Sequence, residues 1–345
     1  MTVKPFILRV RKTKIQRLQS LFLTAYNKIR FTSRESFCFE EEIIMAFTAS
    51  DRTMLEGYIK KARPFEEMFS VKGKTAIVTG GSSGLGFDIT LRLLQGGANV
   101  MIASFSDLER DTAMPLLEEQ GFKDRAAFCL TNVTDEKQME HLVAYTAETF
   151  GSVDIYVNCA ATWNYAKIYD IAKEDIEKVF SVNVYGAFFG IKYVSRYMKE
   201  HDIHGKIVLI SSNCAVMPYP VFGGYPHYAS SKAAIMGLTV ETAKELKRFG
   251  IMVNSVAPGG MVTPGSAGNL ASDNLTEEQQ DEFYEELMVW QTDGQMEVDQ
   301  IGIMAYTLCT AAADGMTGEV IMVDGGATHN IVKYQPAIDA YPEEE

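Results

Sequence analysis

Short apolar runs alternate with helix-length segments through most of the chain, and this alternation restricts the fold more than any other feature. Seven runs rich in Val, Ile and Ala are predicted to be strands: residues 75–79, 98–103, 126–130, 153–157, 206–210, 252–256 and 319–323. Residues 84–95, 134–150, 173–199 and 227–249 are predicted to be helices. Continuous apolar strands separated by helices indicate a parallel sheet covered on both faces. Right-handed crossovers then make a single doubly wound α/β domain with a seven-stranded parallel sheet.

The N-terminal forty-four residues differ in composition from the rest of the 345-residue chain. Residues 1–34 contain nine Lys or Arg and no acid, whereas the whole chain has a net charge of −13. A basic, partly amphipathic stretch is typical of a targeting peptide, but it also fits a disordered extension or a translated leader before a start at Met45. We interpret the chain as a disordered leader or translated upstream region (1–44), an N-terminal extension (45–70), one folded domain (71–330) and an acidic tail (331–345).

Composition narrows the classes of partner and location. With 47% apolar and 22% charged residues, the chain is typical of a globular protein. Nucleic-acid binding requires clustered Lys and Arg to neutralise phosphates, and the net charge of this chain is negative, so we expect no nucleic-acid partner. The sequence has no apolar run of about 18 residues, so we expect no membrane span. Five widely spaced cysteines indicate reduced thiols, a cytoplasmic location and no metal site.

A glycine-rich segment follows the first predicted strand and opens the first predicted helix. It reads Thr79-Gly80-Gly81-Ser82-Ser83-Gly84-Leu85-Gly86. Glycines allow a tight turn and let the backbone approach a pyrophosphate, while the helix N-terminus supplies unpaired N–H groups. A glycine cluster alone is a weak signal, but this position predicts a dinucleotide-binding turn rather than a purely structural one.

The end of the second predicted strand bears on which dinucleotide binds. An acid there would accept a hydrogen bond from the 2′-hydroxyl of NAD(H) and would repel the 2′-phosphate of NADP(H). The strand instead runs into Ser104-Phe105-Ser106, and the nearest base is Arg110. We therefore expect NADP(H) to be slightly favoured over NAD(H).

Tyr228 and Lys232 stand one helical turn apart, so their side chains share a face of the predicted helix. A phenol has an ordinary pKa of about 10, and a neighbouring ammonium lowers it, so such a Tyr can transfer protons near neutral pH. A pair with this spacing is expected about once by chance in a chain of this composition. Ser212, just after the predicted strand 206–210, adds a hydroxyl that can hydrogen-bond a substrate oxygen beside the Tyr.

Together these residues resemble the short-chain dehydrogenase/reductase family over roughly residues 70–330. Further motifs fall in the family's order: Asn158-Cys159-Ala160-Ala161, Asn183, Pro258-Gly259-Gly260-Met261-Val262-Thr263 and Asp324-Gly325-Gly326. The resemblance implies a Rossmann-type NAD(P)-binding catalytic domain and hydride transfer between the cofactor and a substrate carbon. The family usually has a second Asn, a final Gly and an Asp where this chain has Cys159, Ala161 and Asn132.

The resemblance also implies roles for individual residues. Tyr228 would be the general acid/base, Lys232 would lower its pKa and hold the nicotinamide ribose, and Ser212 would polarise the carbonyl. Asn183 would hold a water for proton relay. The residues implied to contact the cofactor are Thr79, Gly80, Ser82, Ser83, Gly84, Leu85, Gly86, Ser104, Phe105, Ser106, Asn132, Val133, Asn158, Ala160, Tyr228, Lys232, Pro258, Gly259, Met261, Val262 and Thr263.

Aromatic and Met side chains occur in the segments expected to line a substrate pocket. The candidates are Trp163, Asn213, Met217, Tyr219, Phe222 and Tyr225. This lining favours a bulky cyclic apolar alcohol or ketone such as a hydroxysteroid, although the same residues are also explained by core packing. Asn164 and Asn213 leave a sugar or polyol as the alternative substrate.

A different class of function is a non-catalytic NAD(P)-binding sensor on the same fold. A sensor would be expected to lack one of Ser212, Tyr228 or Lys232, and all three are present. The sequence therefore favours an enzyme. The family resemblance further implies a homo-oligomer, either a tetramer or a dimer.

Overall fold

The computed structural model describes residues 52–164, 166–217, 225–261, 263 and 296–329. The chain divides into two compact units, Met1–Ala62 and Arg63–Glu345. The described part of the first unit is helix α3, Arg52–Lys61, with the residue that follows it. The second unit contains the sheet and all of the described site candidates.

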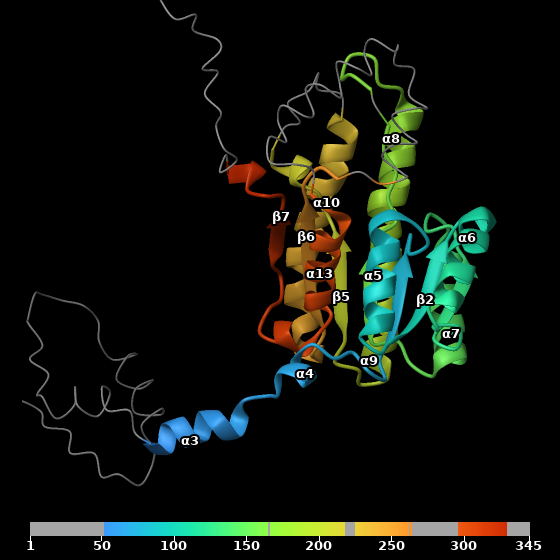
Figure 1. Cartoon of the computed structure of the whole chain (residues 1–345). Helices are drawn as coiled ribbons and strands as arrows, with labels where there is room; N and C mark the ends of the chain where they lie inside the picture. Colours follow the sequence, from blue (N-terminus) through green and yellow to red (C-terminus); the bar gives the residue numbers. More distant parts are fainter. Residues whose placement is uncertain (1–51, 165, 218–224, 262, 264–295, 330–345) are drawn as a thin grey trace, which may run out of the picture. The chain divides into compact units, whose positions relative to one another are not determined.

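The sheet has seven parallel strands, which confirms the predicted α/β fold (Figure 1). The strands are β1 (Thr75–Thr79), β2 (Asn99–Ser104), β3 (Ala126–Leu130), β4 (Ile155–Asn158), β5 (Lys206–Ile210), β6 (Met252–Pro258) and β7 (Val320–Val323). Their order across the sheet is β3-β2-β1-β4-β5-β6-β7. The order reverses between β1 and β4, and ligands of doubly wound sheets bind at such a point, beyond the carboxyl ends of the strands. Thr79 pairs there with Ala103 of β2 and Asn158 of β4.

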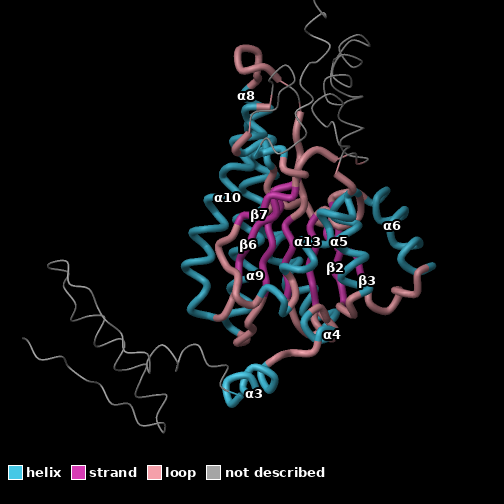
Figure 2. Tube along the Cα trace, turned by 60° about the vertical axis from the view of Figure 1, so that its left-hand side comes forward, coloured by secondary structure: helices cyan, strands magenta, loops and turns pink. Residues whose placement is uncertain are grey.

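Helices cover both faces of this sheet. Their bounds are α4 (Phe65–Met68), α5 (Gly84–Gln95), α6 (Asp107–Glu119), α7 (Glu136–Phe150), α8 (Lys173–Phe180), α9 (Gly186–Glu200), α10 (Pro226–Leu246) and α13 (Val298–Leu308). One core cluster joins the sheet to Leu93 of α5 and Ile301 of α13. A second cluster joins it to Met139 of α7, Val194 of α9 and Ile235 of α10. Figure 2 shows the magenta strands between these two groups of helices.

The strands are apolar throughout because their side chains alternate between two buried faces. In β1, Val78 belongs to the first core cluster and Ile77 to the second, and both are fully buried. This arrangement is the physical reason that the strand pattern was visible in the sequence. Within the described ranges, no helix is both long enough and apolar enough to cross a membrane.

The helices differ from the prediction in two respects. Helices α6 and α13 lie where no helix was assigned; α6 contains Pro115 and buries only Ala113 and Leu117, so its apolar periodicity is weak. The predicted helix 173–199 is divided into α8, a π-helical segment Ser181–Tyr185, and α9.

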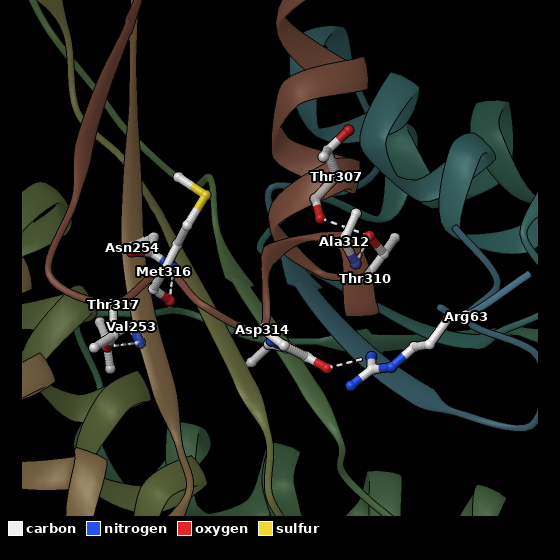
Figure 3. Close-up of polar contacts among 10 residues, drawn as sticks. Arg63, Val253, Asn254, Thr307, Thr310, Ala312, Asp314, Met316 and Thr317 are labelled. Carbon is white, nitrogen blue, oxygen red and sulfur yellow. Dashed lines mark hydrogen bonds and ion pairs between the residues drawn. The ribbon is translucent and has the colours of Figure 1, made fainter. Parts of the chain in front are cut away.

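A polar network fastens the start of β7 to β6 (Figure 3). The buried amide of Asn254 donates to the Met316 carbonyl oxygen (2.9 Å) and accepts from the backbone N–H of Glu319 (3.1 Å). The Thr317 hydroxyl accepts from the backbone N–H of Val253 at 3.1 Å. These bonds satisfy backbone groups that enter the sheet, so the seventh strand is held in register by side chains as well as by the ladder.

Candidate active site

The glycine turn lies at the carboxyl end of β1 and leads directly into α5. Gly84 has a φ of +51°, in the left-handed region that favours glycine, and a Cβ there would lie 3.3 Å from the Thr263 Cβ. A Cβ on Gly86 would lie 2.0 Å from the carbonyl oxygen of Gly80. The helix therefore starts this close to the turn only because residue 86 has no side chain. The result is an open backbone cradle at a helix N-terminus, the geometry that suits a pyrophosphate.

The ends of β1 and β4 are joined by a threonine hydroxyl. The Thr79 Oγ1 accepts from the backbone N–H groups of Cys159 and Ala160, at 3.2 Å each. The hydroxyl thus holds the residues that follow β4 against the glycine turn. Burial raises the pKa of the Cys159 thiol to about 11, which keeps it protonated and unreactive at neutral pH.

Tyr156 of β4, which the sequence analysis did not single out, is buried two residues before the end of this strand. Its hydroxyl donates to Asn158 Oδ1 at 3.0 Å, and burial raises the pKa of the phenol, so it remains a donor. A Cβ on Gly190 of α9 would lie 1.9 Å from the Tyr156 hydroxyl oxygen. Tyr156 therefore fixes the Asn158 amide from below and occupies the space over Gly190.

Lys232 is a buried cation at the carboxyl end of β5. Lys232 belongs to α10, and only 3% of the residue is exposed. Its Nζ donates a hydrogen bond to the carbonyl oxygen of Ile210 at 2.9 Å. Burial lowers the pKa of Lys232 to about 8, against the opposing influence of Cys159 and Cys214. Nζ also lies 5.7 Å from the centre of the Tyr228 ring. The structure thus brings together the two residues that the helical spacing predicted to be neighbours.

Ser212 follows β5 and begins a short 3-10 turn, Asn213–Ala215. Its Oγ accepts from the backbone N–H of Cys214 at 3.2 Å, and the residue is 7% exposed. A serine hydroxyl that accepts one hydrogen bond can still donate its own hydrogen to a ligand oxygen. This polarity is the one needed to polarise a carbonyl.

Asn183 lies in the π-helical segment between α8 and α9. Its Oδ1 accepts from the backbone N–H of Thr162 (2.8 Å), and its Nδ2 donates to the Thr162 carbonyl oxygen (3.0 Å) and to Ser231 Oγ (2.9 Å). The Ser231 hydroxyl in turn donates to the carbonyl oxygen of Tyr228 at 2.7 Å. Asn183 therefore ties the segment after β4 to the first turn of α10. Its water-holding role stays a prediction.

Comparison with known proteins agrees with this geometry. A family model described as enoyl-(acyl carrier protein) reductase matches residues 80–328, more than half of the chain. L-2,3-butanediol dehydrogenase of Corynebacterium glutamicum is 30% identical over 261 residues, which cover 74% of this chain and 99% of the relative. (+)-Borneol dehydrogenase 2 of Salvia officinalis is 34% identical over 277 residues, 76% and 93% respectively.

The chain belongs to the short-chain dehydrogenase/reductase family. A solved structure of an actinorhodin polyketide ketoreductase variant with NADPH has a TM-score of 0.68 and 27% identity, covering 74% of this chain and 97% of that one. Fold and sequence therefore both support the resemblance drawn from the motifs.

Apart from Tyr228 and Lys232 on α10, the described short-chain dehydrogenase/reductase positions implied to contact the cofactor lie at five strand ends. They end or follow β1 (Thr79, Gly80, Ser82, Ser83, Gly84, Leu85, Gly86), β2 (Ser104, Phe105, Ser106), β3 (Asn132, Val133), β4 (Asn158, Ala160) and β6 (Pro258, Gly259, Met261, Thr263). Val262 lies outside the described residues. All strands are parallel, so these ends share one edge of the sheet.

Two of the residues predicted to line the substrate pocket, Trp163 and Tyr225, contact each other near Tyr228. The Trp163 ring packs edge-on against Tyr225 (centroids 5.4 Å apart) and tilts toward Tyr228 (6.5 Å). Met217 is half-buried, whereas Tyr219 and Phe222 lie outside the described residues.

Asn213 does not join this aromatic group. It is 4% exposed and hydrogen-bonds Asp324. Burial raises the pKa of Asp324, hydrogen bonds from Thr328, Gly326 and Asn213 lower it, and the pKa ends below its ordinary value. Asn213 thus tethers the segment after β5 to the segment after β7.

His227 and Asn164 form a pair that sequence reasoning did not anticipate. The buried His227 lies 3.0 Å through Nε2 from Asn164 Oδ1, and its Nδ1 has no hydrogen-bond partner within the described part of the chain. Burial lowers the pKa of His227, although Asp175 opposes the shift, so the ring is neutral near pH 7. With Nε2 carrying the proton, the pair orients the Asn164 amide with its NH2 group away from the histidine.

Glu109 is the second group that the sequence analysis missed. It belongs to the first turn of α6, yet its carboxylate accepts hydrogen bonds from Ser82 in the glycine turn and Ser104 at the end of β2, both at 2.5 Å. Arg110, the base noted beside this strand end, is paired with Asp107 and Asp111. A carboxylate therefore reaches the position where the sequence alone shows only hydroxyls.

Proposed function

We propose that this protein is a nicotinamide-dependent oxidoreductase that interconverts a secondary alcohol and a ketone. The observation that carries the proposal is the buried ammonium of Lys232 beside the Tyr228 ring, next to Ser212 at the carboxyl end of β5. Burying an ammonium opposes folding, and groups with such perturbed pKa values concentrate at functional sites. A sensor or scaffold would gain nothing from this arrangement.

The residues present fit a nicotinamide dinucleotide. A Cβ at Gly80 or Gly86 would collide with neighbouring backbone, and Gly84 has a positive φ, so the turn needs glycine at these positions, as a dinucleotide-binding turn does. The Thr79 hydroxyl holds the neighbouring segment in place, and the Lys232 ammonium is aimed at the same edge of the sheet. When bound, the nicotinamide ring supplies or accepts the hydride.

In the direction of ketone reduction, Tyr228 acts as the general acid and Ser212 orients the carbonyl. The Ser212 hydroxyl donates to the substrate oxygen, which increases the positive character of the carbonyl carbon. The Tyr228 hydroxyl then gives its proton to that oxygen. Lys232 stabilises the resulting phenolate by its positive charge. In alcohol oxidation the same residues act in reverse, with Tyr228 as the general base.

We propose a bulky cyclic apolar alcohol or ketone as the substrate, with a sugar or polyol as the alternative. The edge-on contact of Trp163 with Tyr225 beside Tyr228 supports the first, because aromatic faces suit flat apolar ligands. The oriented amide of Asn164 supports the second, whereas Asn213 is engaged by Asp324. The named relatives are compatible with either class, because one is a dehydrogenase of the small polyol butanediol and another a dehydrogenase of the cyclic alcohol borneol.

A panel of ketosteroids and ketoses, with turnover followed by nicotinamide absorbance using both cofactors, tests the proposal. Trp163→Ala should raise KM for a cyclic ketone about 10-fold or more, because a large apolar contact is removed, and should leave the affinity for the cofactor unchanged. Trp290→Ala, at the chain's other tryptophan, outside the described residues, serves as a comparison. Turnover of ketoses alone, with no effect of Trp163→Ala on KM, would favour the sugar or polyol alternative.

We also propose a homo-oligomer, either a dimer or a tetramer. Tyr185, the last residue of the π-helical segment, and Phe188 of α9 are more than half exposed, and Val240 of α10 is 50% exposed. Large exposed apolar side chains commonly mark protein interfaces where they form a patch. Sedimentation equilibrium is expected to give at least twice the chain mass, and a monomer at micromolar concentration would contradict this proposal.

A cytoplasmic location is part of the same proposal. Cys129, Cys159, Cys214 and Cys309 are free thiols, as a reducing compartment would leave them. Fractionation of the source cells tests it, and recovery in an oxidising compartment would contradict it.

A further inference from the structure

The carboxylate of Glu109 occupies the space between the glycine turn and the end of β2. Its Oε2 accepts hydrogen bonds from Ser82 Oγ and Ser104 Oγ, both at 2.5 Å. Among the residues that the structure describes, its Oε1 has one longer contact, 3.5 Å from Ser83 Oγ. Two hydroxyl donors on one oxygen fix the carboxylate, and the other oxygen retains most of its capacity to accept hydrogen bonds.

The start of α6 explains why this glutamate points back to the sheet. Ser106 is the N-cap of α6, and its hydroxyl accepts from the backbone N–H of Glu109 at 3.4 Å. Glu109 is therefore the third helical residue, a position from which a glutamate side chain commonly turns back past the N-cap. Here the side chain continues to Ser104, so local helix capping delivers an acid to a strand end that has none in its own sequence.

An acid at this place has a defined consequence for dinucleotide binding. In doubly wound folds an acidic side chain about 20 residues beyond the glycine turn hydrogen-bonds the 2′-hydroxyl of the adenosine ribose. Glu109 follows Gly86 by 23 residues and contacts both the turn and the end of β2. A negative carboxylate repels the 2′-phosphate of NADP(H), which would have to lie beside it.

The neighbouring base does not compensate for this charge. Arg110 contacts Asp107 at 2.6 Å and Asp111 at 2.8 Å, so its guanidinium is already paired with two carboxylates of α6. The two carboxylates offset the positive charge of the guanidinium, so it attracts a 2′-phosphate less strongly than a lone arginine would. The charges around the end of β2 therefore favour a hydroxyl ligand over a phosphate.

We infer that Glu109 is the residue that selects NAD(H) over NADP(H) in this protein. The inference rests on the proposed function, because it takes the glycine turn to bind a nicotinamide dinucleotide. It revises the preference for NADP(H), whose premise was the absence of an acid from the end of the second strand. The ketoreductase structure contains NADPH, but at 27% identity its cofactor does not determine the cofactor of this protein.

The test is direct binding of two probes that lack the nicotinamide ring, ADP-ribose and 2′-phospho-ADP-ribose, by isothermal titration calorimetry. The wild-type protein should bind ADP-ribose at least about 10-fold more tightly. Glu109→Gln keeps the size and removes the charge, so it should weaken ADP-ribose binding and strengthen binding of the phosphorylated probe. The ratio of the two dissociation constants should change by about 10- to 100-fold.

Glu118→Gln is the matched control, because Glu118 lies on the same helix and pairs with Lys123 on the surface. It should leave the ratio within about twofold of wild type. Equal or tighter binding of 2′-phospho-ADP-ribose by the wild-type protein would overturn the inference without any variant, and so would an unchanged ratio in Glu109→Gln. Failure of the wild-type protein to bind either probe would overturn the dinucleotide site itself, and with it the proposed function.

Discussion

Tyr228→Phe is expected to reduce kcat by at least about 10³-fold in both directions of the reaction. The substitution removes only the hydroxyl that gives or takes the proton at the substrate oxygen. The ring stays, so its contacts with Trp163 and with the Lys232 ammonium are kept. Steady-state turnover of the best substrate from the panel measures the effect.

Cofactor binding separates this chemical role from a structural one. The dissociation constant of the reduced dinucleotide, followed by fluorescence, should change by less than about threefold in Tyr228→Phe. Tyr145→Phe removes a hydroxyl from α7, on another part of the protein, and should leave turnover unchanged. Turnover above about a tenth of wild type in Tyr228→Phe would refute its assignment as general acid/base.

Lys232→Met is expected to lower kcat and to raise the free energy of unfolding near neutral pH. Methionine fills the same buried volume without a charge, so the phenolate of Tyr228 loses its stabilising cation and kcat should fall by about 10²- to 10³-fold. In the wild-type protein, the pKa of Lys232 is lowered from 10.5 to about 8. A shift of this size corresponds to about 3 kcal/mol of destabilisation when the ammonium is charged in the folded state.

The pH dependence of stability follows from the direction of this shift. Below pH 8 both the folded and the unfolded states hold the proton, so the full penalty applies. Between about pH 8 and pH 10.5 the unfolded state holds it and the folded state does not, so the wild-type protein gains stability relative to the variant as the pH rises. The hydrogen bond to Ile210 offsets about 1–2 kcal/mol of the penalty, so the variant should be more stable by about 1–2 kcal/mol at pH 7.

Urea unfolding of the cofactor-free protein at several pH values between 7 and 10 measures this difference. Lys244→Met is the matched control, because Lys244 lies on the same helix with an exposed side chain. Its unfolding free energy should run parallel to that of wild type. A difference between wild type and Lys232→Met that is constant over this pH range would show that Lys232 is not an energetically strained cation.

The seven parallel strands and the proximity of Tyr228 to Lys232 could be predicted because their signals are local. Strands buried on both faces, such as β1, are apolar at every position, and Tyr228 and Lys232 are neighbours by helical spacing alone. Helix α6 gave no comparable signal, because it buries only Ala113 and Leu117 and contains a proline. The π-helical segment that carries Asn183 has no pattern that distinguishes it from an ordinary helix.

The parts of the site that escaped prediction depend on where side chains turn in space. Glu109 is five residues beyond Ser104 in the chain, and only the geometry of the helix cap brings its carboxylate back to the strand end. Asn213 was predicted to line the substrate pocket, and its hydrogen bond to Asp324, in the segment after β7, was not anticipated. Sequence spacing alone does not show which of several nearby groups a side chain will contact, so these partners were not identified.

The packing of Tyr156 against Gly190 means that these two positions can change only together. A methyl group at residue 190 would overlap the phenol, so α9 can acquire a larger residue there only in a lineage that has already given up the tyrosine. Losing the tyrosine removes the hydroxyl that holds Asn158 at the crevice. Sequence change on the sheet-facing side of α9 is therefore constrained by the buried tyrosine that positions Asn158.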